Sequence, residues 1–136
     1  MTKTSKILIG GQALKSLGSS RNTNDFDYLV NLETTEAFIT SENVDYLNAN
    51  GNKFFAEIYK IEEGNEIATP QSLLELKAFA FVQHCQNFNF QKADDCEFDI
   101  RFLVRKFNLT DVKIVRNYVT SGELSEITKN INNTKI

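Results

Sequence analysis

The sequence feature that most constrains the fold is an apolar run that ends in two adjacent glycines. Residues 6–9 read Lys-Ile-Leu-Ile, and Gly10 and Gly11 follow at once. An apolar run before a glycine pair is typical of a buried strand that turns sharply. Residues 12–17 then carry apolar side chains at helical spacing, and Gly18 ends that pattern. We therefore expect a strand, a turn whose bare backbone N–H groups are able to hold an anion, and a short helix.

A second predicted strand, residues 25–32, begins with two carboxylates. Side chains alternate between the two faces of a strand, so Asp25 and Asp27 share one face while Phe26 and Tyr28 occupy the other. Two carboxylates about 5 Å apart repel by roughly 3 kcal/mol at an effective dielectric constant near 20. A shared divalent cation removes this repulsion, and Mg²⁺ is the most suitable one. The spacing therefore predicts a magnesium site.

The order of these motifs resembles that of the nucleotidyltransferase fold of the DNA polymerase β superfamily. The glycine pair is followed by Arg21-x-Thr23-x-Asp25-x-Asp27 and an apolar strand. The resemblance is best over residues 7–32 and weaker through about residue 107. It is closest to the small prokaryotic members, which include the AbiEii-like toxin group and the minimal nucleotidyltransferases of toxin–antitoxin pairs. The resemblance implies an α/β (α+β) fold, with a small mixed β-sheet flanked by helices.

The resemblance also implies an activity and a set of roles. The activity is magnesium-dependent transfer of a nucleoside monophosphate from a nucleoside triphosphate such as ATP to a hydroxyl of RNA, protein or a small molecule, in a toxin–antitoxin or phage-defence setting. The implied catalytic and metal-binding residues are Asp25, Asp27 and Glu57. The implied nucleotide- and phosphate-binding residues are Gly10, Gly11, Gln12, Arg21, Thr23 and Lys77. For Arg21, an ion pair with the neighbouring carboxylates that holds the loop is an equally open interpretation.

The third carboxylate is assigned by its surroundings. Residues 53–62 are rich in strand formers and end at the hairpin signal of residues 63–65, so we expect a strand. Glu57 lies there between apolar neighbours, as the third carboxylate of the resembled family does, although that family more often has Asp. The alternative is an outward-facing glutamate on a half-exposed strand. Residues 44–47, before it, fit either a helical turn or a short strand.

A helix is predicted to begin at Thr69-Pro70 and to run to about residue 85, largely buried. Lys77 interrupts its apolar surface, and the resemblance implies that this lysine reaches the nucleotide phosphates. The alternative is a lysine whose stem packs while its amine extends to water. His84 is expected to be a packing residue.

Three further helices are expected, beginning near residues 94, 110 and 123. The first opens with a capping-box pattern, in which Asp94 and Asp99 are expected to cap and pair rather than to catalyse. Its basic residues are Arg101, Arg105 and Lys106. They form a local patch that is typical of a solvated helix face and is also able to contact a polynucleotide or protein. The other two helices are expected over residues 110–119 and 123–131.

Length and charge limit the remaining possibilities. A chain of 136 residues is expected to form a single nucleotidyltransferase-like domain over residues 1–136. A net charge of −3 excludes a general basic field for nucleic acid, so any such contact is local. Cys85 and Cys96 lack ligand spacing, so we expect reduced thiols rather than zinc. Without an apolar run of about 20 residues or a signal-peptide core, we expect no membrane contact and a cytoplasmic protein.

Two alternatives to an enzyme stay open. In the first, the chain is a catalytically inactive nucleotidyltransferase-fold interaction protein of the antitoxin or anti-defence type. In the second, an unrelated α/β domain carries the two aspartates as a surface pair. The short chain has no added domain to choose an acceptor, so a partner chain or a homo-oligomer is a further expectation.

Overall fold

The computed structural model describes residues 6–32 and 43–134. It divides into two compact units, Met1–Thr69 and Pro70–Ile136, which we call the N-terminal and C-terminal units and describe separately. Helices and a small mixed β-sheet together confirm the predicted α+β class. The single-domain organisation over residues 1–136 stays a prediction.

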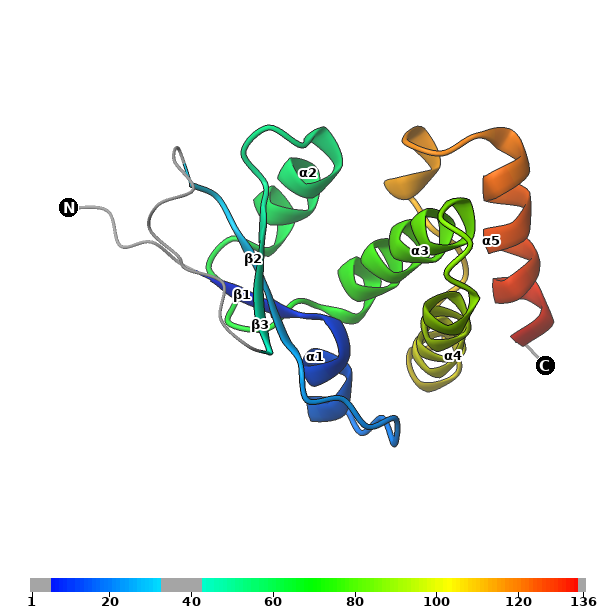
Figure 1. Cartoon of the computed structure of the whole chain (residues 1–136), viewed down its shortest axis with the longest axis horizontal. Coiled ribbons are helices and arrows are strands. Elements are labelled where there is room, and N and C mark those ends of the chain that lie inside the picture. The colour runs from blue at the N-terminus through cyan, green and yellow to red at the C-terminus, as the bar shows by residue number, and fades with distance from the viewer. Residues whose placement is uncertain (1–5, 33–42, 135–136) are drawn as a thin grey trace. The chain divides into compact units, whose positions relative to one another are not determined.

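The N-terminal unit contains a three-stranded sheet in the order β1-β2-β3 (Figure 1). Its strands are β1 (Ile7–Ile9), β2 (Phe26–Val30) and β3 (Val44–Asn48). β1 is antiparallel to β2, and β2 is parallel to β3, so the sheet is mixed. Both strands expected on either side of the glycine turn are confirmed. The open alternative for residues 44–47 is resolved as a strand.

The two faces of the sheet differ in polarity and burial. Ile7, Ile9 and Leu29 are buried on the face that also carries Asp27. On the opposite face, the rings of Tyr28 and Tyr46 stack with their centroids 5.7 Å apart. Helix α1 (Gly10–Ser16) follows β1 directly, with the glycine pair as its first two residues, and packs against β1 and β2. The predicted alternation is confirmed from Phe26 to Val30, whereas Asp25 lies before the strand begins.

The prediction of a strand over residues 53–62 is wrong, because this segment is helix α2 (Lys53–Glu62). Its buried side chains, Phe54, Ile58 and Glu62, recur every four residues and so lie on one helix face. The Asn52 side chain caps the helix by accepting the backbone N–H of Phe55 at 3.0 Å. Periodicity and the cap therefore outweigh the strand propensity of the aromatic and β-branched residues.

The carboxylate of Glu62 fixes the end of the N-terminal unit. It is fully buried and accepts hydrogen bonds from the backbone N–H of Thr69 at 2.9 Å and from Asn65 Nδ2 at 3.1 Å. Between these two residues, Ile67 forms a parallel bridge with Leu8 of β1. Glu62 thus stabilises the segment after α2 that pairs with β1.

The C-terminal unit is helical (Figure 1). Its elements are α3 (Pro70–Gln86), α4 (Phe90–Phe107), the 3₁₀ turn η1 (Val115–Asn117) and α5 (Ser121–Thr134). Helix α4 packs against both α3 and α5. The fully buried apolar side chains are Leu73, Leu74, Ala78, Ile100, Leu103, Val112, Val115, Ile127 and Ile131. The helix predicted to begin at Thr69-Pro70 is confirmed.

Two predicted boundaries in this unit are wrong. Helix α4 begins at Phe90 with Asn89 as its N-cap, so Asp94 lies inside the helix and does not cap it. Residues 110–119 contain only the short turn η1 instead of a helix. The last predicted helix is confirmed as α5, which extends beyond both expected ends. None of the helices in the described ranges is long and apolar enough to cross a bilayer.

Candidate functional site

The side chains that follow β1 and α1 converge on the turn formed by Gly10 and Gly11. Gly10 has φ +70°, and a Cβ atom added there would lie 2.6 Å from Asp27 Oδ2. A Cβ atom on Gly11 would lie 2.6 Å from Thr23 Cγ2 and 3.3 Å from Arg21 Nη2. Both positions therefore require glycine, because the space of a Cβ atom is already filled. The structure thus brings Asp27, Thr23 and Arg21 together at one bend of the main chain.

The loop that carries Arg21 and Thr23 is braced by local hydrogen bonds. Gln12 Nε2 donates to the carbonyl oxygen of Thr23 at 2.9 Å. The Thr23 hydroxyl accepts the backbone N–H of Asp25 at 3.3 Å. Gln12 and Thr23 therefore have a structural use at this turn, and their predicted contact with phosphate stays a prediction.

Sequence reasoning missed a carboxylate next to Asp27. Asp27 of β2 pairs in register with Asp45 of β3, and residues in register on neighbouring strands project from the same face of a sheet. Asp45 is exposed, Asp27 is half-buried, and Asp25 is exposed just before β2 begins. The available signal was the tripeptide Asp-Tyr-Leu, which occurs at residues 27–29 and again at residues 45–47.

The predicted triad of Asp25, Asp27 and Glu57 is not formed. Glu57 lies on α2, not on a strand, and faces solvent beside the buried Ile58. Within residues 6–32 and 43–134, no three acidic, histidine or cysteine side chains are grouped closely enough to hold a metal ion. The strand on which the assignment of Glu57 as third carboxylate depended does not exist, and the assignment stays a prediction without that support.

Lys77 is held by an acidic side chain in the C-terminal unit. Its Nζ atom lies 3.0 Å from Asp99 Oδ2, and the two side chains are 15% and 1% exposed. The ion pair joins α3 to α4 and confirms that Asp99 has a pairing role. The stem of Lys77 is packed, as the open alternative had it, but the amine pairs with Asp99. The phosphate contact of Lys77 stays a prediction.

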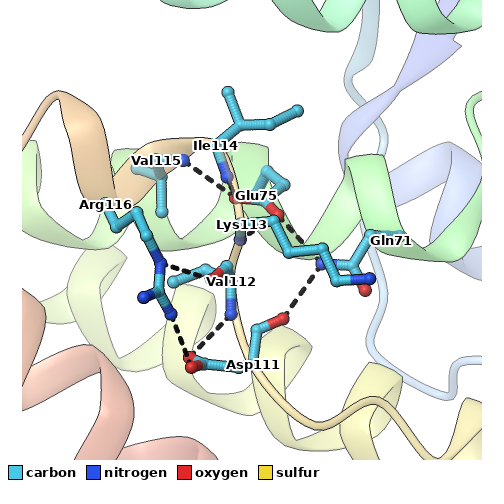
Figure 2. Close-up of polar contacts among 8 residues, drawn as sticks. All are labelled: Gln71, Glu75, Asp111, Val112, Lys113, Ile114, Val115 and Arg116. Carbon is cyan, nitrogen blue, oxygen red and sulfur yellow. Dashed lines mark hydrogen bonds and ion pairs between the residues drawn. The ribbon is translucent and has the colours of Figure 1, made fainter.

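A second buried acid, Glu75 of α3, also has structural hydrogen-bond partners (Figure 2). The carboxylate of Glu75 is fully buried and accepts the backbone N–H groups of Lys113, Ile114 and Val115 at 2.7, 3.0 and 2.9 Å. Gln71 Nε2 donates to the same carboxylate at 2.9 Å. Glu75 thus satisfies the donors at the start of η1, which explains why a carboxylate is tolerated in this core.

His84 is half-buried on α3. Burial is the main cause that lowers the pKa of its imidazole, and the positive charges of Lys92 and Lys77 lower it further. The neutral form is therefore favoured, as expected for a packing residue on α3.

No protein-family model, curated protein or solved structure matches this chain.

Proposed function

We propose that the protein is a nucleotidyltransferase whose nucleotide site is the Gly10–Gly11 turn. The observation that carries the proposal is the convergence of Asp27 and Arg21 on that turn, where neither glycine has room for a side chain. An acidic and a cationic side chain beside bare backbone are the groups that a metal-bound triphosphate requires. The substrate is then a nucleoside triphosphate, and the acceptor is a hydroxyl of RNA, protein or a small molecule.

The acidic residues fit a magnesium site with fewer protein ligands than the resemblance implies. Mg²⁺ is commonly held by one or two carboxylates together with substrate phosphates and water. Asp27 and Asp25 supply these carboxylates, and Asp45 lies in register with Asp27 on the same face. When bound, Mg²⁺ would neutralise charge on the phosphate oxygens.

The chain's own residues would position the triphosphate. In this proposal the N–H groups of the glycine turn would hydrogen-bond phosphate oxygens, and the Arg21 guanidinium is suited to contact two of them at once. Gln12 holds the loop at Thr23, so Arg21 keeps its place against Gly11. Positioning and charge neutralisation of this kind supply most of the catalysis in phosphoryl transfer.

Label transfer tests this proposal. The protein is incubated with each nucleoside triphosphate labelled at the α-phosphate and with Mg²⁺, in a cell extract with and without RNA. The Asp27→Asn variant is expected to lose at least about 100-fold in transfer, because one charge-stabilising group is removed. Asp94→Asn, which changes an exposed acid on α4, is the matched control and is expected to keep full transfer. Absence of transfer by the wild type with all four nucleotides, or equal transfer by Asp27→Asn, contradicts the proposal.

A second candidate is an interaction protein that has lost catalysis, of the antitoxin or anti-defence type. The observation that favours it is the position of Glu57 on the solvent side of α2, which leaves no three-carboxylate group among the described residues. This candidate predicts that wild type and Asp27→Asn capture the same partner chain from an extract and that neither transfers label.

We further infer a cytoplasmic location. Cys85 and Cys96 are both free thiols, and such thiols persist in a reducing compartment.

A further inference from the structure

Helix α4 carries an open groove that the proposed nucleotide site does not use. The groove has a volume of about 320 Å³ and is lined by Phe98, Phe102, Arg105 and Lys106. Spacings of four and three residues place these side chains along one side of the helix. Phe98 is 48% exposed, so its ring is accessible to a ligand. The groove therefore combines apolar rings with positive charge.

The two cations of the groove differ in how they are held. Lys106 Nζ lies 5.7 Å from the centroid of the Phe102 ring, within the range of a cation–π interaction. Arg105 is exposed and makes no ion pair with any residue that the structure describes. Glu97, the acidic residue one position before Phe98, is engaged by Arg101 at 2.6 Å. The local charge of the groove is therefore positive although the whole chain carries −3.

This combination selects among the possible occupants. A purely apolar partner would strip water from Arg105 and Lys106 without compensation, which is costly. An acidic peptide would pair with the cations but would leave Phe98 without a partner ring. A single-stranded polynucleotide offers flat bases to the phenyl rings and phosphates to the cations at the same time. We infer that the groove on α4 binds single-stranded polynucleotide by base stacking and phosphate contact.

This inference does not rest on nucleotidyl transfer. It depends only on residues of α4, and it predicts binding in the absence of Mg²⁺ and of any nucleoside triphosphate. Binding that survives in Asp27→Asn is therefore expected, and it separates a failure of this inference from a failure of the proposed function.

Fluorescence anisotropy of the full chain tests the stacking contribution. The probe is fluorescein-labelled oligo(U), titrated in low-salt buffer. The double variant Phe98→Leu/Phe102→Leu keeps an apolar side chain at both positions but loses the rings, and is expected to raise Kd about tenfold. Phe90→Leu is the matched control, because Phe90 is 59% exposed on the same helix and lies outside the groove. It is expected to bind as the wild type does. Far-UV circular dichroism verifies that each variant is folded.

The salt dependence of Kd tests the phosphate contacts. Each phosphate contact with a single strand adds about 0.7 to the slope of log Kd against log salt concentration, so Arg105→Gln/Lys106→Gln is expected to lower the slope by about 1.4. Lys92→Gln, which removes an exposed cation elsewhere on α4, is expected to leave the slope unchanged.

Three results would overturn the inference. They are the absence of saturable oligo(U) binding by the wild type, equal affinity of Phe98→Leu/Phe102→Leu and the wild type, and competition by polyglutamate as strong as by unlabelled oligo(U). The last result would assign the groove to an acidic protein partner instead.

Discussion

The carboxylates of Glu75 and Asp27 show how the two units use acidic side chains differently. Glu75, in the C-terminal unit, is fully buried, and three backbone N–H groups and Gln71 donate to it. Asp27, in the N-terminal unit, is half-buried and lies against a bare glycine in a left-handed conformation. In the first arrangement the carboxylate satisfies hydrogen-bond donors inside the core. The second places a half-buried carboxylate directly against the main chain of Gly10.

The cations follow the same division. Lys77, in the C-terminal unit, forms a largely buried pair with Asp99 that joins two helices. Arg21, in the N-terminal unit, lies beside Gly11 in a loop of turn-forming residues. Substitutions of the buried Glu75 and of Lys77 are therefore expected to alter stability, while those of Asp27 and Arg21 are expected to alter ligand binding.

The largest effect on stability is expected from Glu75→Ala. The substitution removes the acceptor for three backbone donors, and an unsatisfied buried donor costs about 1–3 kcal/mol. Because water is able to reach part of this segment, we expect a total loss of about 3 kcal/mol in the free energy of unfolding. Urea denaturation followed by circular dichroism measures it.

Glu126→Gln is the control for Glu75→Ala, since Glu126 is exposed on α5. Its effect is expected to stay within about 0.5 kcal/mol. The milder variant Glu75→Gln keeps one acceptor oxygen and is expected to lie between the two. If Glu75→Ala were as stable as Glu126→Gln, the carboxylate would not be a structural anchor and the contrast with Asp27 would fail.

A smaller effect is expected from Gly10→Ala. Alanine at φ +70° is strained by about 1 kcal/mol, and its Cβ atom would also displace Asp27 Oδ2. We expect a total loss of about 2 kcal/mol. Gly64→Ala is a matched control, because Gly64 has φ +93° but nothing within 4 Å of an added Cβ atom. Thermal unfolding of both variants separates strain from displacement, and an equal loss in the two would show that Asp27 does not press on the turn.

The smallest effect is expected at the start of α5. The pKa of Glu123 lies below its ordinary value of 4.5, mainly because its carboxylate accepts a hydrogen bond from the backbone N–H of Thr120. A hydrogen bond from the side chain of Gln86 lowers the pKa further. A lowered pKa stabilises the folded state above the unfolded-state pKa, and this stabilisation is lost as the pH falls through the folded-state pKa. Solvent screening limits it to about 0.3 kcal/mol. The urea midpoints of wild type and Glu123→Ala are measured above and below about pH 4.5, and the difference between the two proteins is expected to shrink at the lower pH. A difference that stays constant would contradict the assigned cause.

The fold was predictable where one signal dominated. The apolar run before Gly10 and the Thr69-Pro70 pair gave the correct element types, because each combined a periodic pattern with a strong start or stop signal. The segment over residues 53–62 failed because its Phe and Ile residues favour a strand while their four-residue spacing favours a helix. The packing of Phe54 and Ile58 in the core decides between the two.

The candidate site was predictable only in part for a similar reason. The local order of the motif placed Asp27, Thr23 and Arg21 near the glycine turn, and the structure brings these side chains to it. The position of Asp45 next to Asp27 depends on the pairing of β3 with β2. That pairing is a long-range contact, which the local order of the motif does not specify. Lys77 looked available because its partner Asp99 is far along the chain.

The central claim is that the Gly10–Gly11 turn, with Asp27 beside it, is a nucleotide site. Isothermal titration calorimetry with a non-hydrolysable nucleoside triphosphate analogue and Mg²⁺ tests it most directly. We predict saturable binding by the wild type and by Glu126→Gln, and a loss of affinity of at least about tenfold in Asp27→Asn, equivalent to about 1.4 kcal/mol. The absence of binding by the wild type to analogues of all four nucleotides, or unchanged affinity in Asp27→Asn, would contradict the claim.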